Sequence, residues 1–218
     1  MPKSKRNTKV NLSKVVKATK ERKEKLLNQI RLAVEEYDNV FVWEEHNMRN
    51  NTMKDLKCKE WAHSKFFYGK VKLMALALGK TRALETRKNL HKLVPHLTGH
   101  VGLLFTNKDK TEVKAFFEEF SAFHYATSGE TATESVVLEA GILDQFPHSI
   151  EPHLRELGMP VKLNKGSVEL MKQYTVCTEG ELLRPNQCRI LKLLGYQMSK
   201  FTIKLKCCCS KDGKFEAL

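Results

Sequence analysis

Strand-like and helix-like runs alternate along most of this 218-residue chain, and their order constrains the fold more than any other feature. The strand-like runs, rich in β-branched and aromatic residues, are 40–43, 65–68, 100–105 and 201–207. The helix-like runs have apolar residues spaced for one face, and they cover 13–34, 51–63, 71–78, 84–94, 109–120 and 186–194. Alternating elements of this kind bury their apolar faces most completely in layers, so the sequence predicts an α/β fold.

The alternation breaks in the middle of the chain. Residues 124–150 are rich in Gly, Ser and Thr and contain only short apolar runs, such as 136–138. A short helix is expected at 152–157 and a short strand at 160–163. We therefore expect a layered α/β domain with an inserted smaller α+β domain. The expected parts are a basic N-terminal arm at 1–24, the α/β domain at 25–106 and 186–210, the acidic insertion at 107–185 and a short tail at 211–218.

Charge follows the same division of the chain. The formal net charge is +13. By segment it is +8 for 1–25, −4 for 26–48, +9 for 49–92, zero for 93–106, −5 for 107–185 and +5 for 186–218. Such segregation indicates that one part of the molecule lies on a polyanion while the acidic section stays off it.

Several classes of protein are disfavoured by composition. No apolar run approaches the roughly 18–20 residues that span a bilayer, and the N-terminus lacks the apolar segment of a secretory signal. The six cysteines form no CxxC pair, so a zinc ribbon has no ligand spacing, and reduced thiols are expected. In a strand, Cys207 and Cys209 would share one face and Cys208 would lie on the other. We expect neither a membrane partner nor a cofactor.

Two clusters could be mistaken for active sites. His148 and His153 in the HSIEPH run are five residues apart, which is out of register for a helical metal site, and Pro152 marks a helix start. Glu44 and Glu45 have no nucleophile with a recognisable motif beside them. The sequence therefore predicts neither a metal site nor catalysis.

Two short segments are more informative. NMRN (47–50) and FFYGKVK (66–72) each follow an expected strand and open an expected helix. Backbone N–H groups at a helix N-terminus attract phosphate oxygens, and glycine permits a close approach. Two such basic turns at one end of a sheet would form a phosphate-binding edge.

These segments, together with HVGLLFTN (100–107), QFPHSIEPHLRELGMP (145–160) and LKLLGY (191–196), resemble the ribosomal stalk-base protein family, and most of all its assembly-factor members. The similarity covers about residues 1–206. It implies an rRNA-binding α/β domain interrupted by an inserted domain. It also implies binding to the GTPase-associated centre of large-subunit rRNA in pre-60S particles, beside neighbouring ribosomal proteins. There the protein would hold the stalk-base site until the mature stalk protein replaces it, through a release factor that the sequence does not identify.

The resemblance and the charge pattern together give a set of expected rRNA-binding residues. They are Lys5, Arg6, Asn47, Arg49, Asn50, Lys54, Lys65, Gly69, Lys70 and Lys72. Of these, Arg49, Asn50, Gly69 and Lys70 match RNA-facing positions of the family. Val71 departs from the family, which usually has Asn there. The sequence ends at Leu218, and we expect a protein that lacks the helical spine and acidic tail of mature stalk proteins.

Other functions stay open at this point. The chain could be a truncated stalk-base protein of the mature ribosome, or its acidic insertion could be a protein-docking module. A nuclease is a further alternative, although the clustered carboxylates of two-metal chemistry are missing. The leading interpretation is a non-enzymatic ribosome biogenesis factor of the nucleolus and nucleus, with shuttling to the cytoplasm.

Overall fold

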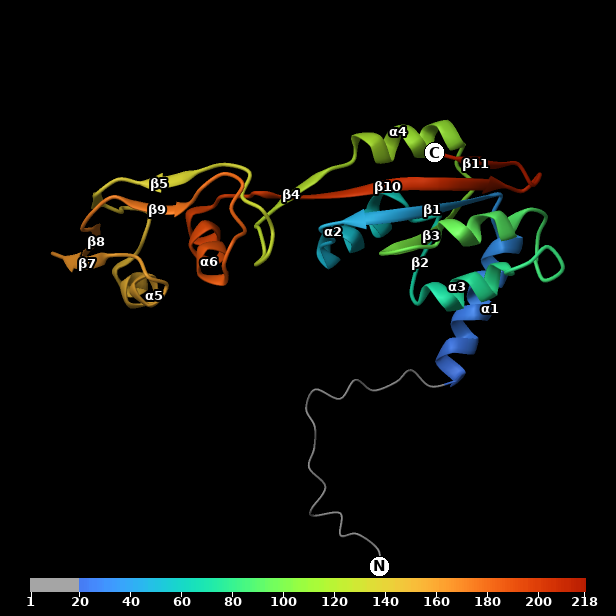
Figure 1. The fold of residues 1–218 in the computed structure, drawn as a ribbon, viewed down its shortest axis with the longest axis horizontal. Helices are drawn as coiled ribbons and strands as arrows, with labels where there is room; N and C mark the ends of the chain where they lie inside the picture. Colours follow the sequence, from blue (N-terminus) through green and yellow to red (C-terminus); the bar gives the residue numbers. More distant parts are fainter. Residues whose placement is uncertain (1–19) are drawn as a thin grey trace, which may run out of the picture. The chain divides into compact units, whose positions relative to one another are not determined.

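The computed structural model describes residues 20–218, which divide into two compact units (Figure 1). The first unit contains described residues up to 42 together with 63–108 and 206–218. The second unit contains 43–62 and 109–205. Each unit takes part of the long strands β1 (Asn39–His46) and β10 (Ser199–Ser210).

The remaining elements fall within single units. Those of the first unit are α1 (Lys20–Glu36), β2 (Lys65–Tyr68), α3 (Val71–Leu78), the 3-10 helix η3 (Leu90–His96), β3 (Val101–Thr106) and β11 (Phe215–Ala217). Those of the second unit are α2 (Asn50–Asp55), the π-helical turn η2 (Leu56–Glu60), α4 (Lys110–Glu119), β4 (Ala122–His124), β5 (Val136–Leu138), β6 (Gly141–Ile142), the 3-10 turn η4 (His148–Ile150), α5 (Glu151–Glu156), β7 (Val161–Asn164), β8 (Ser167–Leu170), β9 (Tyr174–Cys177) and α6 (Pro185–Leu194). None of the helices within 20–218 is both long and apolar enough to cross a bilayer.

The main sheet has the strand order β11-β10-β1-β3-β2, and β4 pairs with β10 beside it. Strand β2 lies at one edge and pairs antiparallel with β3, with Lys65 opposite Phe105 and Tyr68 opposite Gly102. Two smaller sheets belong to the second unit, one of β5 and β9 and one of β6, β8 and β7. The chain is thus a mixed α/β protein, as predicted.

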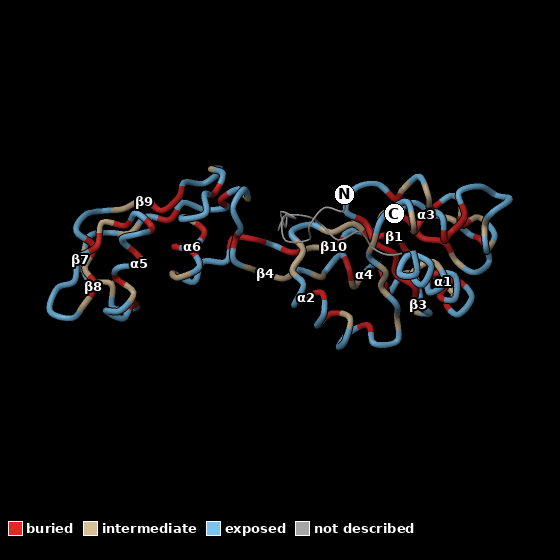
Figure 2. The backbone as a smooth tube through the Cα atoms, turned by 90° about the horizontal axis from the view of Figure 1, so that it is seen from below, coloured by how far each residue is buried: buried red, intermediate tan, exposed pale blue. Residues whose placement is uncertain are grey.

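The core of the first unit lies between its strands and three helices. Helices α1 and α3 lie beside each other (Figure 1) and bury Ile30, Val34 and Leu78 against Val42 and Leu103. Every residue of β3 is buried (Figure 2), which is typical of a strand covered on both faces.

The second unit has two apolar clusters. Ring contacts join Trp61 to Phe116 and Phe117 of α4, and Phe120 to Phe201 of β10. The aromatic face of α4 is therefore core packing. A separate cluster includes Leu154, Val168 and Val176 together with Ile190 and Leu191, so α6 packs with the elements that precede it. The domain boundaries at 107 and 185 stay a prediction.

Most predicted elements are present, but the helix expected at 84–94 is wrong. Only η3 forms there, because residues 84–89 bond to other parts of the first unit instead of to each other. The guanidinium of Arg87 donates to the carbonyls of Val34, Tyr37 and Asp38, and Asn89 has a left-handed backbone with φ 67°. Burial lowers the pKa of Arg87, and the three carbonyl bonds offset part of the cost of burying its guanidinium.

Gly79 explains how the chain enters this loop. Its φ is +91°, and a Cβ at this position would lie 2.5 Å from the carbonyl oxygen of Leu84. Only glycine fits this conformation and this close approach. The predicted end of the helix at Gly79 is confirmed.

The cysteines are free, as expected, and Cys207 and Cys209 share the core of the first unit. Burial raises the pKa of Cys207 to about 12. The predicted alternation of this run along a strand is confirmed for these two residues.

Candidate nucleic-acid interface

The turn between β2 and α3 has the features of an anion-binding site. Lys70 caps α3 with an extended backbone, and its side chain makes no capping bond. The first turn of α3 contains no acidic residue, and Lys70 and Lys72 are exposed. Among residues 20–218, the backbone N–H groups of Val71 and Lys72 have no hydrogen-bond partner. Two N–H groups without a partner in this part of the chain, the positive end of the helix dipole and two exposed cations therefore lie at one helix end.

Gly69 and Val71 hold this turn against the core. A Cβ on Gly69 would lie 3.2 Å from Cδ2 of Leu26, so the absence of a side chain permits tight packing against α1. Val71, which stands where the family usually has Asn, packs against the core cluster of the first unit. The turn is thus positioned by apolar contacts, and its N–H groups are left for a ligand.

Lys65 differs from Lys70 in that its charge already has a partner. Its Nζ lies 2.5 Å from Oε2 of Glu36 and 5.3 Å from the ring centroid of Tyr37. The pKa of Lys65 is raised, chiefly by the hydrogen bond to Glu36. A phosphate would have to compete with Glu36 for this ammonium group.

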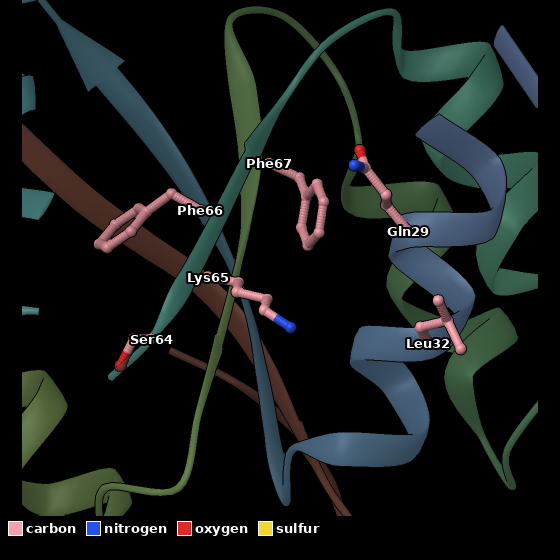
Figure 3. A pocket seen from close by; sticks show the side chains of 6 residues that line it. All are labelled: Gln29, Leu32, Ser64, Lys65, Phe66 and Phe67. Atoms are coloured by element: carbon pink, nitrogen blue, oxygen red, sulfur yellow. The ribbon is translucent and has the colours of Figure 1, made fainter. Parts of the chain in front are cut away.

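A groove of about 380 Å³ lies beside Lys65, at the outer edge of β2. Figure 3 shows Phe67 pointing from β2 toward α1, whereas Phe66 points to the other side of the strand. Leu32 and Gln29 of α1 form the opposite wall. Phe67 contacts Phe105 edge-to-face at 5.5 Å, so the base of this groove is part of the core.

The NMRN turn of the second unit follows β1 and precedes α2, as predicted. Asn47 has a left-handed backbone with φ 54°, and its Nδ2 donates to the carbonyl of Lys200 at 3.3 Å. Arg49 points into the unit. Its Nη2 donates to the carbonyl of Tyr125 at 2.8 Å and lies 3.5 Å from a carboxylate oxygen of Glu130.

This turn therefore differs from the one before α3. Only 27% of the Arg49 side chain is exposed, and α2 has six residues, so its dipole is weak. Asn47, Asn50 and Lys54 are exposed, and of these Asn47 is held by its bond to the carbonyl of Lys200. Thr52 Oγ1 lies 2.7 Å from Nε2 of His124, which joins α2 to β4.

Lys5 and Arg6 lie outside the described residues. The prediction that the NMRN and GK turns share one end of a sheet stays a prediction. Sequence reasoning missed Phe123 and Lys200, which pair across β4 and β10 next to the NMRN turn. The aromatic run FHY at 123–125 was the available signal, but a three-residue strand is too short to show periodicity.

The clusters that could have been mistaken for active sites have structural partners. HSIEPH forms η4 and the start of α5, with Pro152 in the first turn of the helix, as predicted. Glu151 is buried and pairs with Arg155 one turn later. Glu44 and Glu45 lie at the end of β1, and both are partly buried.

Comparison with known proteins gives two adjoining family matches. Residues 18–122 match the family described as Ribosomal protein L10, and residues 126–195 match the insertion domain described in the 60S ribosomal protein of that family. The ribosome assembly factor mrt4 of Dictyostelium discoideum is 38% identical over 206 residues, 94% of this chain and 92% of its own length. The mrt4 of Saccharomyces cerevisiae is 32% identical over 98% of this chain and 95% of its own. The large ribosomal subunit protein uL10 of Thermococcus sibiricus is 32% identical over 61% of this chain and 39% of its own.

Proposed function

The chain belongs to the ribosomal protein L10 family, and on this premise we propose that it is a ribosome assembly factor that binds rRNA. The RNA it binds is the stalk-base rRNA of the pre-large subunit. It occupies this site as a placeholder that the mature stalk protein later replaces. It acts by binding and carries out no chemistry.

One observation carries the RNA-binding part of this proposal. The N-terminus of α3 presents two N–H groups that have no partner within residues 20–218, next to Lys70 and Lys72 and with no acidic residue in the first turn. Cations at a helix N-terminus oppose the helix dipole, and an anion bound there relieves that cost. A phosphate of the RNA backbone fits this requirement, and contacts of this kind fix position and shape rather than read bases.

The predicted RNA-binding residues divide into two groups under this proposal. Asn50, Lys54, Lys70 and Lys72 are exposed and can reach phosphates without losing a bond. Arg49 and Lys65 are engaged with Glu130 and Glu36, so we assign them to the positioning of their turns. Asn47 positions its turn in the same way, through the carbonyl of Lys200. Gly69 allows the GK turn to pack against α1. Lys5 and Arg6, which lie outside the described residues, are proposed as further phosphate contacts.

The two kinds of relative support the placeholder role. Assembly factors match over nearly the whole chain, and a mature ribosomal protein of the same family matches over a part of it. Two proteins that bind one rRNA site with the same domain exclude each other. A truncated mature stalk protein is not favoured, because the near-full-length relatives are assembly factors.

Crosslinking in cells tests this proposal. With mapped RNA sites, we expect crosslinks to the stalk base of large-subunit rRNA, in nucleolar and nuclear pre-60S fractions and not in polysomes. Charge reversal at Lys70→Glu should move the protein out of these fractions. Lys172→Glu, at an exposed lysine of the second unit, is the matched control and should leave it there. Crosslinks confined to polysomes, or to other RNAs, would contradict the proposal.

A further inference from the structure

The side chain of Phe123 stands out on the surface of the second unit. It is 60% exposed, more than any other aromatic side chain among residues 20–218. It lies on β4 directly opposite Lys200 of β10, and Nζ of Lys200 is 5.9 Å from its ring centroid. An exposed aromatic ring flanked by a cation is a typical surface for stacking a nucleobase.

Three bonds join the NMRN turn and α2 to β4, to the residue after it and to its partner strand β10. Asn47 donates to the carbonyl of Lys200, Arg49 donates to the carbonyl of Tyr125, and Thr52 contacts His124. Alternation along β4 directs Phe123 away from the side on which His124 meets α2. The strand that carries the ring is therefore fixed beside the NMRN turn. We propose that this turn lies at the RNA interface.

The charge around the ring suits a polyanion. Lys200 and Lys204 are exposed on one face of β10, whereas Phe201 and Ile203 between them are buried. Glu130, the acidic group of the adjacent segment, is engaged by Arg49. Glu44 and Glu45 of β1 are partly buried and have partners. A strand of RNA can thus place phosphates on these lysines while a base covers the ring.

We propose that Phe123 is a stacking platform for an unpaired base of the rRNA, with Lys200 contacting the neighbouring phosphate. This inference rests on the proposed function, since it adds a second contact to the same RNA. It adds what phosphate contacts lack, namely a preference for a single-stranded loop or bulge over a duplex.

The test compares two substitutions at one position with a matched control. Phe123→Leu keeps an apolar side chain but removes the ring, and should weaken binding of a stalk-base rRNA fragment roughly 5- to 150-fold. Its salt dependence should stay that of the unchanged protein, because stacking releases no counterions. Phe123→Trp should retain affinity, and its added fluorescence should be quenched when the fragment binds. Ile142→Ala, at a residue of the same unit that is also 60% exposed, should bind normally.

The outcomes separate the two claims. If the unchanged protein binds the fragment and Phe123→Leu binds equally well, the stacking proposal is wrong and the proposed function stands. If the unchanged protein does not bind the fragment, the proposed function itself fails. If Phe123→Leu binds naked RNA normally but leaves pre-60S particles, the ring contacts a protein, which also overturns the proposal.

Discussion

Substitution of Arg49 by Ala should destabilise the second unit before it affects RNA binding directly. The guanidinium donates to the carbonyl of Tyr125 and lies 3.5 Å from Glu130, with 27% and 21% of the two side chains exposed. A hydrogen bond to a charged group contributes about 1.5–3 kcal/mol. The ion pair is discounted to at most about 1 kcal/mol, because both partners keep contact with solvent.

Together these contacts give an expected loss of about 2 kcal/mol in the free energy of unfolding. For a chain of this size, that corresponds to a Tm lower by about 4–8 °C. Hydrogen exchange should locate the loss, with faster exchange in β4 and in the segment up to Glu130. Thermal unfolding followed by circular dichroism measures the first effect, and mass spectrometry measures the second.

Lys54→Ala is the control for this experiment, because Lys54 lies in α2 of the same segment and is exposed. It should leave Tm within about 1 °C of the original value. The reasoning would be refuted if Arg49→Ala kept its Tm while the salt dependence of RNA binding fell by one phosphate contact. Arg49 would then be an RNA contact and not a positioning residue.

Three further outcomes are expected. Titration of the folded protein with a thiol reagent at pH 8 should modify the exposed Cys58 quickly and the five buried cysteines only on unfolding. Burial shields these five thiols from the reagent, and it raises the pKa of Cys207 to about 12. Fast reaction of two or more thiols would contradict this prediction. Gly79→Ala should lower the free energy of unfolding by more than about 1 kcal/mol in a urea titration, because φ is +91° and a Cβ meets backbone at 2.5 Å. The N-cap of α4, Asp109, should stabilise the helix less in acid, because hydrogen bonds from Thr111 lower the pKa of the Asp109 carboxylate. The stabilisation of α4 by this carboxylate is full above about pH 4 and is lost as pH falls through the lowered pKa. Asp109→Ala should therefore flatten this part of the curve of Tm against pH.

Local sequence patterns predicted the elements that carry the site. The strand at Lys65–Tyr68, the helix at Val71–Leu78 and the glycine that ends it are as expected, because their signals lie within one short window. The basic GK turn followed from the same window. Its two free N–H groups are a consequence of the helix start itself.

Contacts between distant segments could not be predicted in this way. Arg49 bonds to Tyr125, 76 residues later, and nothing near Arg49 in the sequence distinguishes it from an exposed cation. Likewise, Phe123 and Lys200 meet only because β4 pairs with β10. The prediction of a helix at 84–94 failed for the same reason, since Arg87 bonds to the carbonyls of Val34 and Tyr37 at the end of α1. Tertiary partners override local propensity at each of these positions.

The central claim is that the N-terminus of α3 binds rRNA phosphates, and the salt dependence of binding tests it most directly. The affinity for a stalk-base rRNA fragment is measured at several salt concentrations for the unchanged chain and for Lys70→Ala with Lys72→Ala. Each phosphate contact contributes roughly 0.7–0.9 to the log–log slope, so the double substitution should reduce its magnitude by about 1.4–1.8. Lys172→Ala should leave it unchanged. A slope near zero for the unchanged chain, or the same slope with and without Lys70 and Lys72, would contradict the account.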